Sequence, residues 1–126
     1  FKRIDHVEIL PYDVDRTMKF YTEILGFKLK NRIAINKPPL KEVIYLQLSD
    51  SVIELVCVEN PQKREKLPQE VGFCALAMEV EDMQKALEYL QEKGVKIHLP
   101  AVDLGDSFRA EVLDPDSLVI ELRQWK

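Results

Sequence analysis

The chain has 126 residues, which is the size of one domain and enough to bury a core without disulfides. Apolar residues make up 46% and charged residues 32%, as in ordinary soluble globular proteins, and the net charge is -4. The lysines are scattered, so the sequence lacks the basic surface that nucleic-acid binding requires. No apolar run approaches the roughly 20 residues of a membrane span, and the segment after Phe1 does not resemble a signal peptide.

The first predicted elements are a strand and a helix. Residues 4–10 mix β-branched and apolar side chains with polar ones, which indicates a strand. The apolar residues that follow recur at spacings of four, three and four, as on one helix face: Val14, Met18, Tyr21 and Leu25. Asp13 or Asp15 is suited to cap the start of this helix, and Gly26 to end it.

Three strands and a linker are predicted next. The strands are residues 28–34, 42–48 and 52–58, separated by turn-forming residues. Residues 59–70 contain two prolines and nine charged or amide side chains, which is typical of a linker.

The same pattern then begins again. Residues 73–80 predict a strand, and a helix face with spacings of four and three ends at a glycine; its residues are Met83, Leu87, Leu90 and Gly94. Further strands are predicted at residues 95–99, 109–113 and 118–123. Equivalent positions in the two halves lie 67 to 69 residues apart, too far for a solenoid repeat. We therefore expect one α+β domain, residues 1–126, made of two βαβββ modules at 1–58 and 71–126.

Alternation along the strands sorts the polar side chains onto one face. If Val7 and Ile9 pack on the helix side, His6 and Glu8 lie on the opposite face. By the same reasoning this face also carries Glu54 in the first module, and Ala75, Glu79 and Glu121 in the second. A carboxylate among apolar neighbours must be paired, protonated or bound to a cation, unless that face is open to water. Taken together, His6, Glu54 and Glu121 are a plausible ligand set for a divalent metal ion.

Several strings resemble the motifs of one family. They are Ile4 to Val7, the "FYxxxLGF" string from Phe20 to Phe27, the two "IEL" strands around Glu54 and Glu121, and the Asp114-Pro115-Asp116 turn, where Ser117 replaces a glycine. The chain thereby resembles the vicinal oxygen chelate superfamily, which includes glyoxalases, bleomycin resistance proteins and extradiol dioxygenases. The resemblance implies that the two modules form an incomplete, barrel-like cavity.

The resemblance also implies a ligand set, in which the metal is held by the first and last strands of both modules. Carried over by position, the ligands would be His6, Glu54 and Glu121, and Ala75 stands where the family has a histidine. Three protein ligands still suffice for a catalytic metal. The ion could be Mn, Fe, Ni, Zn or Mg, and a set with two carboxylates favours Mn²⁺, Fe²⁺ or Mg²⁺.

Two functions follow from the resemblance. The first is a metal-dependent lyase or isomerase, similar to lactoylglutathione lyase, acting on a small substrate that chelates the metal through two oxygens. Its catalytic base would be Glu121 or Glu54, and Glu8 and Glu79 would move protons or orient the substrate. The alternative is a non-catalytic protein that binds a drug or metabolite, like the bleomycin resistance proteins. Its pocket, enlarged at Ala75, would use aromatic and charged side chains: Tyr45, Phe108, Arg109 and Trp125.

An extradiol dioxygenase fits less well, because that site needs histidines at the positions of both His6 and Ala75. We expect a homodimer, as is common in the family, with a small-molecule ligand. Cys57 and Cys74 form no CxxC motif and no disulfide ladder, which favours the reducing cytoplasm.

Overall fold

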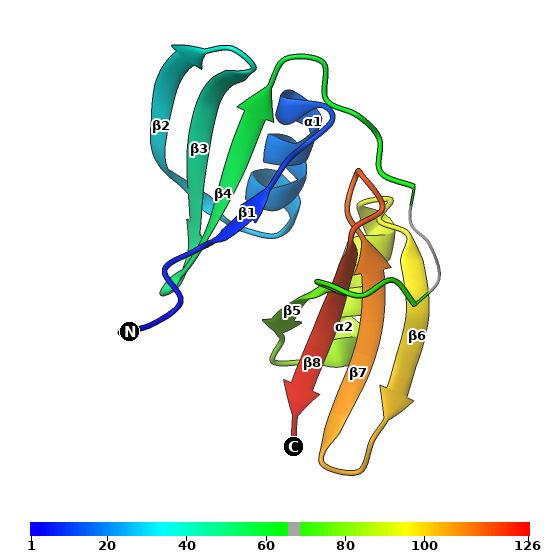
Figure 1. Cartoon of the computed structure of the whole chain (residues 1–126). Helices are drawn as coiled ribbons and strands as arrows, with labels where there is room; N and C mark the ends of the chain where they lie inside the picture. Colours follow the sequence, from blue (N-terminus) through cyan, green and yellow to red (C-terminus); the bar gives the residue numbers. More distant parts are fainter. Residues whose placement is uncertain (66–68) are drawn as a thin grey trace. The chain divides into compact units, whose positions relative to one another are not determined.

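The computed structural model describes residues 1–65 and 69–126 (Figure 1), so the middle of the predicted linker lies outside the described residues. The chain divides into two compact units, Phe1–Glu65 and Lys66–Lys126. Each unit contains a four-stranded mixed sheet and a helix in the order β-α-β-β-β. The predicted α+β class with two βαβββ modules is confirmed.

Unit 1 has the strand order β1-β4-β3-β2. Its elements are β1 (Val7–Ile9), α1 (Val14–Lys19), β2 (Lys28–Lys37), β3 (Leu40–Leu48) and β4 (Ser51–Val58), with a π-helical turn at Phe20–Ile24 between α1 and β2. The edge strand β1 runs parallel to β4, and the other neighbouring strands are antiparallel. This parallel pairing brings the start of the module beside its last strand.

The helix of unit 1 begins and ends as its sequence indicates. The Asp13 side chain caps it by accepting a hydrogen bond from the Arg16 backbone N–H at 3.1 Å. Gly26 follows the π-helical turn with φ at +84°, a conformation that favours glycine. The predicted first strand was too long, because only Val7 to Ile9 pair with β4 and Ile4 is exposed.

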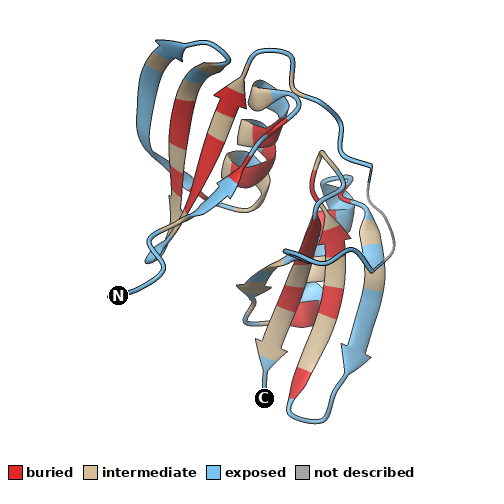
Figure 2. Ribbon diagram, viewed as in Figure 1, coloured by how far each residue is buried: buried red, intermediate tan, exposed pale blue. Residues whose placement is uncertain are grey.

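The core of unit 1 lies between α1 and one face of the sheet (Figure 2). The residues with at most 1% exposure include Tyr21, Ile44, Leu46 and Leu55. In β4 the alternate residues Ile53, Leu55 and Cys57 are all buried. Because strand side chains alternate, Glu54 projects from the other face of the sheet.

Unit 2 repeats this plan with the strand order β5-β8-β7-β6. Its elements are β5 (Leu76–Glu79), α2 (Met83–Glu92), β6 (Ile97–Asp103), β7 (Ser107–Leu113) and β8 (Val119–Trp125). Its most buried residues include Ala110, Val112, Ile120 and Leu122. The strand predicted at 73–80 is shorter than expected, because the chain pairs with β8 only from Leu76. None of the described helices has the length and apolar character needed to cross a membrane.

The turn before β8 is held by Asp114. Its carboxylate accepts hydrogen bonds from the backbone N–H groups of Asp116 at 2.8 Å and Leu118 at 2.9 Å. Between them, Ser117 has φ at +62°, the left-handed conformation that glycine adopts at lower cost. The hydrogen bonds of Asp114 therefore maintain the turn although Ser117 stands where the family has a glycine.

Candidate functional site

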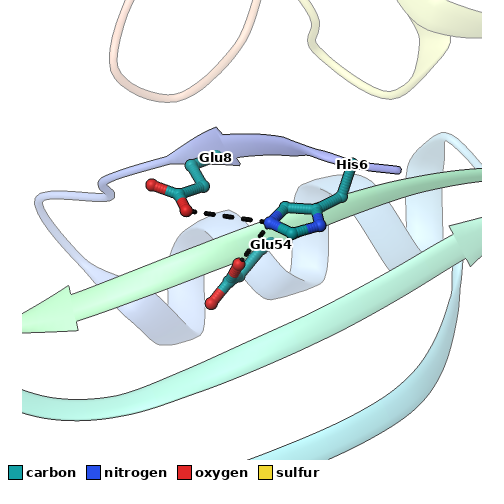
Figure 3. A group of neighbouring side chains, drawn as sticks. All are labelled: His6, Glu8 and Glu54. Carbon is teal, nitrogen blue, oxygen red and sulfur yellow. Dashed lines mark ion pairs between the residues drawn. The ribbon is translucent and has the colours of Figure 1, made fainter. Parts of the chain in front are cut away.

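In unit 1, His6 and Glu54 meet across two adjacent strands (Figure 3). His6 precedes β1, and the parallel register sets Val7 beside Ile53 and Glu8 beside Glu54. The His6 Nε2 atom lies 2.8 Å from Glu54 Oε2. The Glu54 side chain is only 8% exposed, so its carboxylate has lost most of its water and requires a polar partner.

Glu8 completes a group of three possible metal ligands. Its Oε1 lies 3.7 Å from His6 Nε2, and its side chain is 65% exposed. One ligand atom from each of His6, Glu8 and Glu54 can be chosen so that all three lie within 4.8 Å of one another. An imidazole and two carboxylates at this separation fit a divalent ion, because the donor types and number match those of catalytic metal sites.

The imidazole of His6 is oriented by its neighbours. Its Nδ1 lies 2.8 Å from the Asp5 carboxylate, which accepts the Nδ1–H hydrogen bond. The Tyr45 ring packs edge-to-face against the imidazole, with ring centroids 5.7 Å apart. With Nδ1 as the donor to Asp5, Nε2 is the nitrogen that faces the two glutamates. In the imidazolium form Nε2 donates to Glu54, and in the neutral form it offers its lone pair to a metal, as in many metal-ligating histidines. Sequence reasoning missed Asp5, although a carboxylate directly before a ligand histidine is a usable signal.

The same contacts shift the pKa values at this site. The hydrogen bond with Asp5 is the largest cause that raises the pKa of His6, and Glu54 raises it further, while burial opposes them. Burial and a hydrogen bond with Glu54 raise the pKa of Tyr45. Tyr45 therefore remains a neutral hydrogen-bonding group beside Glu54.

The raised pKa of His6 predicts how the stability of the metal-free protein depends on pH. The folded state binds the His6 proton more tightly than the unfolded state does, in which the pKa of His6 is near 6.5. This contribution to stability is therefore fully present below the unfolded pKa and is lost as the pH rises through the folded pKa. Chemical unfolding in the presence of a chelator measures this effect. The free energy of unfolding of the wild type should decrease as the pH rises through this range, and the decrease should be absent in His6→Gln. If His6→Gln shows the same pH profile as the wild type, His6 is not the source of this pH dependence.

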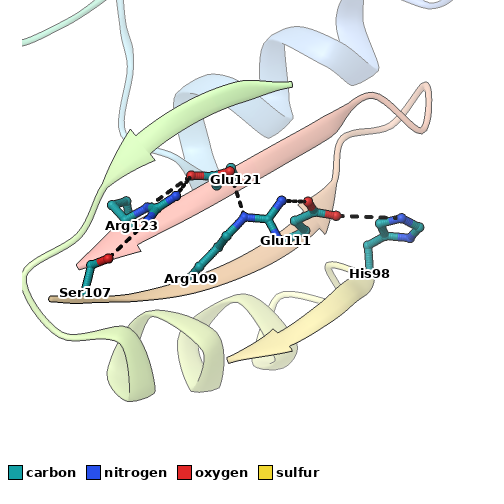
Figure 4. A network of polar contacts seen from close by, with 6 residues as sticks. All are labelled: His98, Ser107, Arg109, Glu111, Glu121 and Arg123. Carbon is teal, nitrogen blue, oxygen red and sulfur yellow. Dashed lines mark hydrogen bonds and ion pairs between the residues drawn. The ribbon is translucent and has the colours of Figure 1, made fainter. Parts of the chain in front are cut away.

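In unit 2, Glu121 lies within a network of charged side chains (Figure 4). Arg109 Nε donates to Glu121 Oε2 at 2.9 Å, and Arg123 donates to Glu121 Oε1 from Nε at 3.1 Å and from Nη2 at 2.6 Å. Arg109 also pairs with Glu111, whose carboxylate lies 3.8 Å from His98 Nε2. Burial would raise the pKa of Glu121, but the hydrogen bonds from Arg123 and Arg109 outweigh it and lower that pKa. Glu121 is thus held as a carboxylate by two guanidinium groups.

A cavity of about 310 Å³ opens beside this network. Its lining comes from β5 and β8 and consists of Ala77, Met78, Glu79, Glu121, Arg123 and Trp125. The Arg123 guanidinium carbon lies 5.4 Å from the centroid of the Trp125 ring. The cavity therefore combines apolar side chains with paired charges.

The predicted site residues fall into two groups. Unit 1 brings together His6, Glu8, Tyr45 and Glu54, whereas unit 2 brings Arg109 to Glu121 and places Glu79 in the cavity wall. Two predicted residues lie apart from these contacts. Ala75 is exposed just before β5, and Phe108 packs under Lys126, whose Nζ is 4.6 Å from the ring centroid. Sequence reasoning did not identify the ion-pairing roles of Arg123 and Glu111.

Comparison with known proteins gives consistent matches. The family model described as Glyoxalase/Bleomycin resistance protein/Dioxygenase superfamily matches residues 3–122. The uncharacterized protein YwkD of Bacillus subtilis is 32% identical over 125 residues, which cover 96% of this chain and 95% of that protein. Lactoylglutathione lyase of Schizosaccharomyces pombe is 26% identical over 140 residues, and this chain spans 46% of its length. The solved structure of the trypanothione-dependent glyoxalase I of Leishmania major has a TM-score of 0.82 at 26% identity, covering 98% of this chain and 87% of that one.

Proposed function

The chain belongs to the glyoxalase/bleomycin resistance protein/dioxygenase superfamily, and from this we propose that it is a metal-dependent lyase or isomerase. Its substrate would be a small molecule with two neighbouring oxygen atoms. The observation that carries the proposal is the group formed by His6, Glu8 and Glu54, with its ligand atoms within 4.8 Å of one another. The likeness to a lactoylglutathione lyase and to a glyoxalase I supports an activity of this kind.

His6 and Glu54 are the proposed fixed ligands of the metal. Glu54 is buried, and the ring of His6 is held by Asp5 and Tyr45, so neither ligand has far to move when an ion binds. A bound divalent ion supplies Lewis-acid chemistry to the oxygens of the substrate. Two carboxylates beside one imidazole favour Mn²⁺, Fe²⁺ or Mg²⁺ over a thiophilic ion.

Glu8 is the proposed proton carrier. Its side chain is mostly exposed, in contrast to that of Glu54, so it is free to leave the metal group and reach a bound substrate. A carboxylate within hydrogen-bond reach can remove a proton from the carbon next to a carbonyl and return it to the adjacent carbon. Glu8 would thus perform the transfer while His6 and Glu54 keep the site assembled.

Exchange of substrate hydrogen with solvent tests this proposal. The purified protein, supplied with Mn²⁺ in D₂O, should exchange the hydrogen next to the carbonyl in some members of a panel of small α-hydroxycarbonyl compounds, as followed by proton NMR. Glu8→Gln should lower the exchange rate by about 100-fold or more while Mn²⁺ still binds. Stoichiometric Mn²⁺ binding and ligand binding without any exchange would instead support a non-catalytic binding protein. If Mn²⁺ does not bind, both the proposed metal site and the proposed metal-dependent activity are wrong.

A further inference from the structure

Most of the hydrogen-bonding capacity of the Glu121 carboxylate is used within unit 2. Three hydrogen bonds from Arg109 and Arg123 reach its two carboxylate oxygens, at 2.9, 3.1 and 2.6 Å. We infer that Glu121 is the counter-ion of these two arginines, in place of the metal-ligand role that its strand position predicts. Divalent metal binding by this chain then depends on the ligands of unit 1; this second statement rests on the proposed function.

The register of β7 and β8 explains why these charged side chains pair with one another. Arg109 lies opposite Arg123, and Glu111 lies opposite Glu121. Like charges directly opposite one another destabilise a sheet, whereas the diagonal from Arg109 to Glu121 joins opposite charges. Two guanidiniums and two carboxylates on one face of the two strands therefore neutralise one another.

Burial makes this pairing important. The side chains of Arg109, Glu121 and Arg123 are 30%, 18% and 23% exposed, so all three have given up much of their hydration. Removing one member of such a set leaves an uncompensated charge in a poorly solvated place. A divalent cation at Glu121 would have to displace hydrogen bonds from two positive groups and remain beside them, which is electrostatically unfavourable.

The inference gives unit 2 a role different from that of unit 1. The two ligand positions carried over to unit 2 are Ala75, which has no donor atom in its side chain, and Glu121, which is engaged by arginines. The positive charge that Glu121 requires is supplied by the protein itself. Unit 2 therefore carries fixed, paired charges in the wall of its own cavity, next to Met78 and Trp125.

Melting temperatures of Glu121→Gln, measured first with a chelator, test the counter-ion role. We expect the substitution to lower the melting temperature by about 5 °C, because both arginines lose an ionised partner. Glu79→Gln is the matched control, since Glu79 lines the same cavity but is exposed, and it should change the melting temperature by about 1 °C or less. An unchanged or higher melting temperature for Glu121→Gln would overturn the inference. That result is expected if Glu121 is a buried carboxylate without a cationic partner, because removing its charge then costs no ion pair.

The same proteins are then melted with added Mn²⁺. The rise in melting temperature caused by Mn²⁺ should be equal in the wild type and Glu121→Gln, and loss of the rise in this variant would overturn the inference. If Glu121→Gln does not fold, the charge-balanced double variant E121Q/R123M replaces it, because Arg109 keeps Glu111 as its partner. If Mn²⁺ does not raise the melting temperature of the wild type, the proposed function fails, and the measurements with chelator alone decide the role of Glu121.

Discussion

Glu54→Gln is expected to weaken the binding of Mn²⁺ by at least about 100-fold, as measured by isothermal titration calorimetry. Loss of a residue that only orients a metal ligand already costs 10- to 100-fold, so loss of a ligand should cost at least as much. Glutamine keeps the size of Glu54 and can still form a hydrogen bond with His6, which lies 2.8 Å away. The effect should therefore come from the lost negative charge rather than from a change in the fold.

The control for this prediction is Glu59→Gln. Glu59 follows β4 directly and is exposed, so its replacement makes the same change in net charge away from the candidate ligands. We expect Mn²⁺ binding by this variant to match the wild type. If Glu54→Gln binds Mn²⁺ as tightly as Glu59→Gln does, the group formed by His6, Glu8 and Glu54 is not the metal site.

Leu55→Ala should lower the free energy of unfolding by about 3 kcal/mol. Leu55 is completely buried in β4, between the sheet and α1, and its truncation leaves a cavity that the surrounding residues fill only in part. Because Leu55 is the direct neighbour of Glu54, this packing also fixes the strand that carries the candidate ligand. Urea denaturation followed by circular dichroism measures the loss.

Leu29→Ala is the matched comparison, because it removes the same atoms from a side chain that is 52% exposed on β2. Its effect should stay below about 1 kcal/mol. Equal losses for the two variants would show that Leu55 does not occupy the tightly packed core described above.

Much of the fold could be predicted from the sequence because the helix and strand periodicities occur twice in the same order. Asp13 and Gly26 mark the two ends of the first helical segment, and the structure places a cap and a left-handed turn there. Strand ends were harder to predict. Ile4 and Phe73 have strand-like side chains but remain exposed, because strand length depends on a partner that local sequence does not reveal.

The candidate site could be predicted in part. Alternation along the strands predicted that His6 and Glu54 share a face, and their contact at 2.8 Å agrees with it. The partners of Glu121 were not predictable in the same way, since they depend on the register between β7 and β8. A shift of one residue would turn Arg109 to the opposite face of the sheet, and no sequence pattern specifies the register to that accuracy.

The parallel pairing of β1 with β4 also determines when the candidate site can form during folding. His6 and Glu54 are 48 residues apart in the chain, whereas β2, β3 and β4 pair with their neighbours in sequence. Contacts between distant residues carry a larger loop-closure entropy than local hairpins and form more slowly. On a ribosome, a nascent chain that ends before β4 carries His6 without its carboxylate partner. The pair is therefore assembled only when the whole first module has emerged, and metal affinity in refolding experiments would report the closure of that long loop.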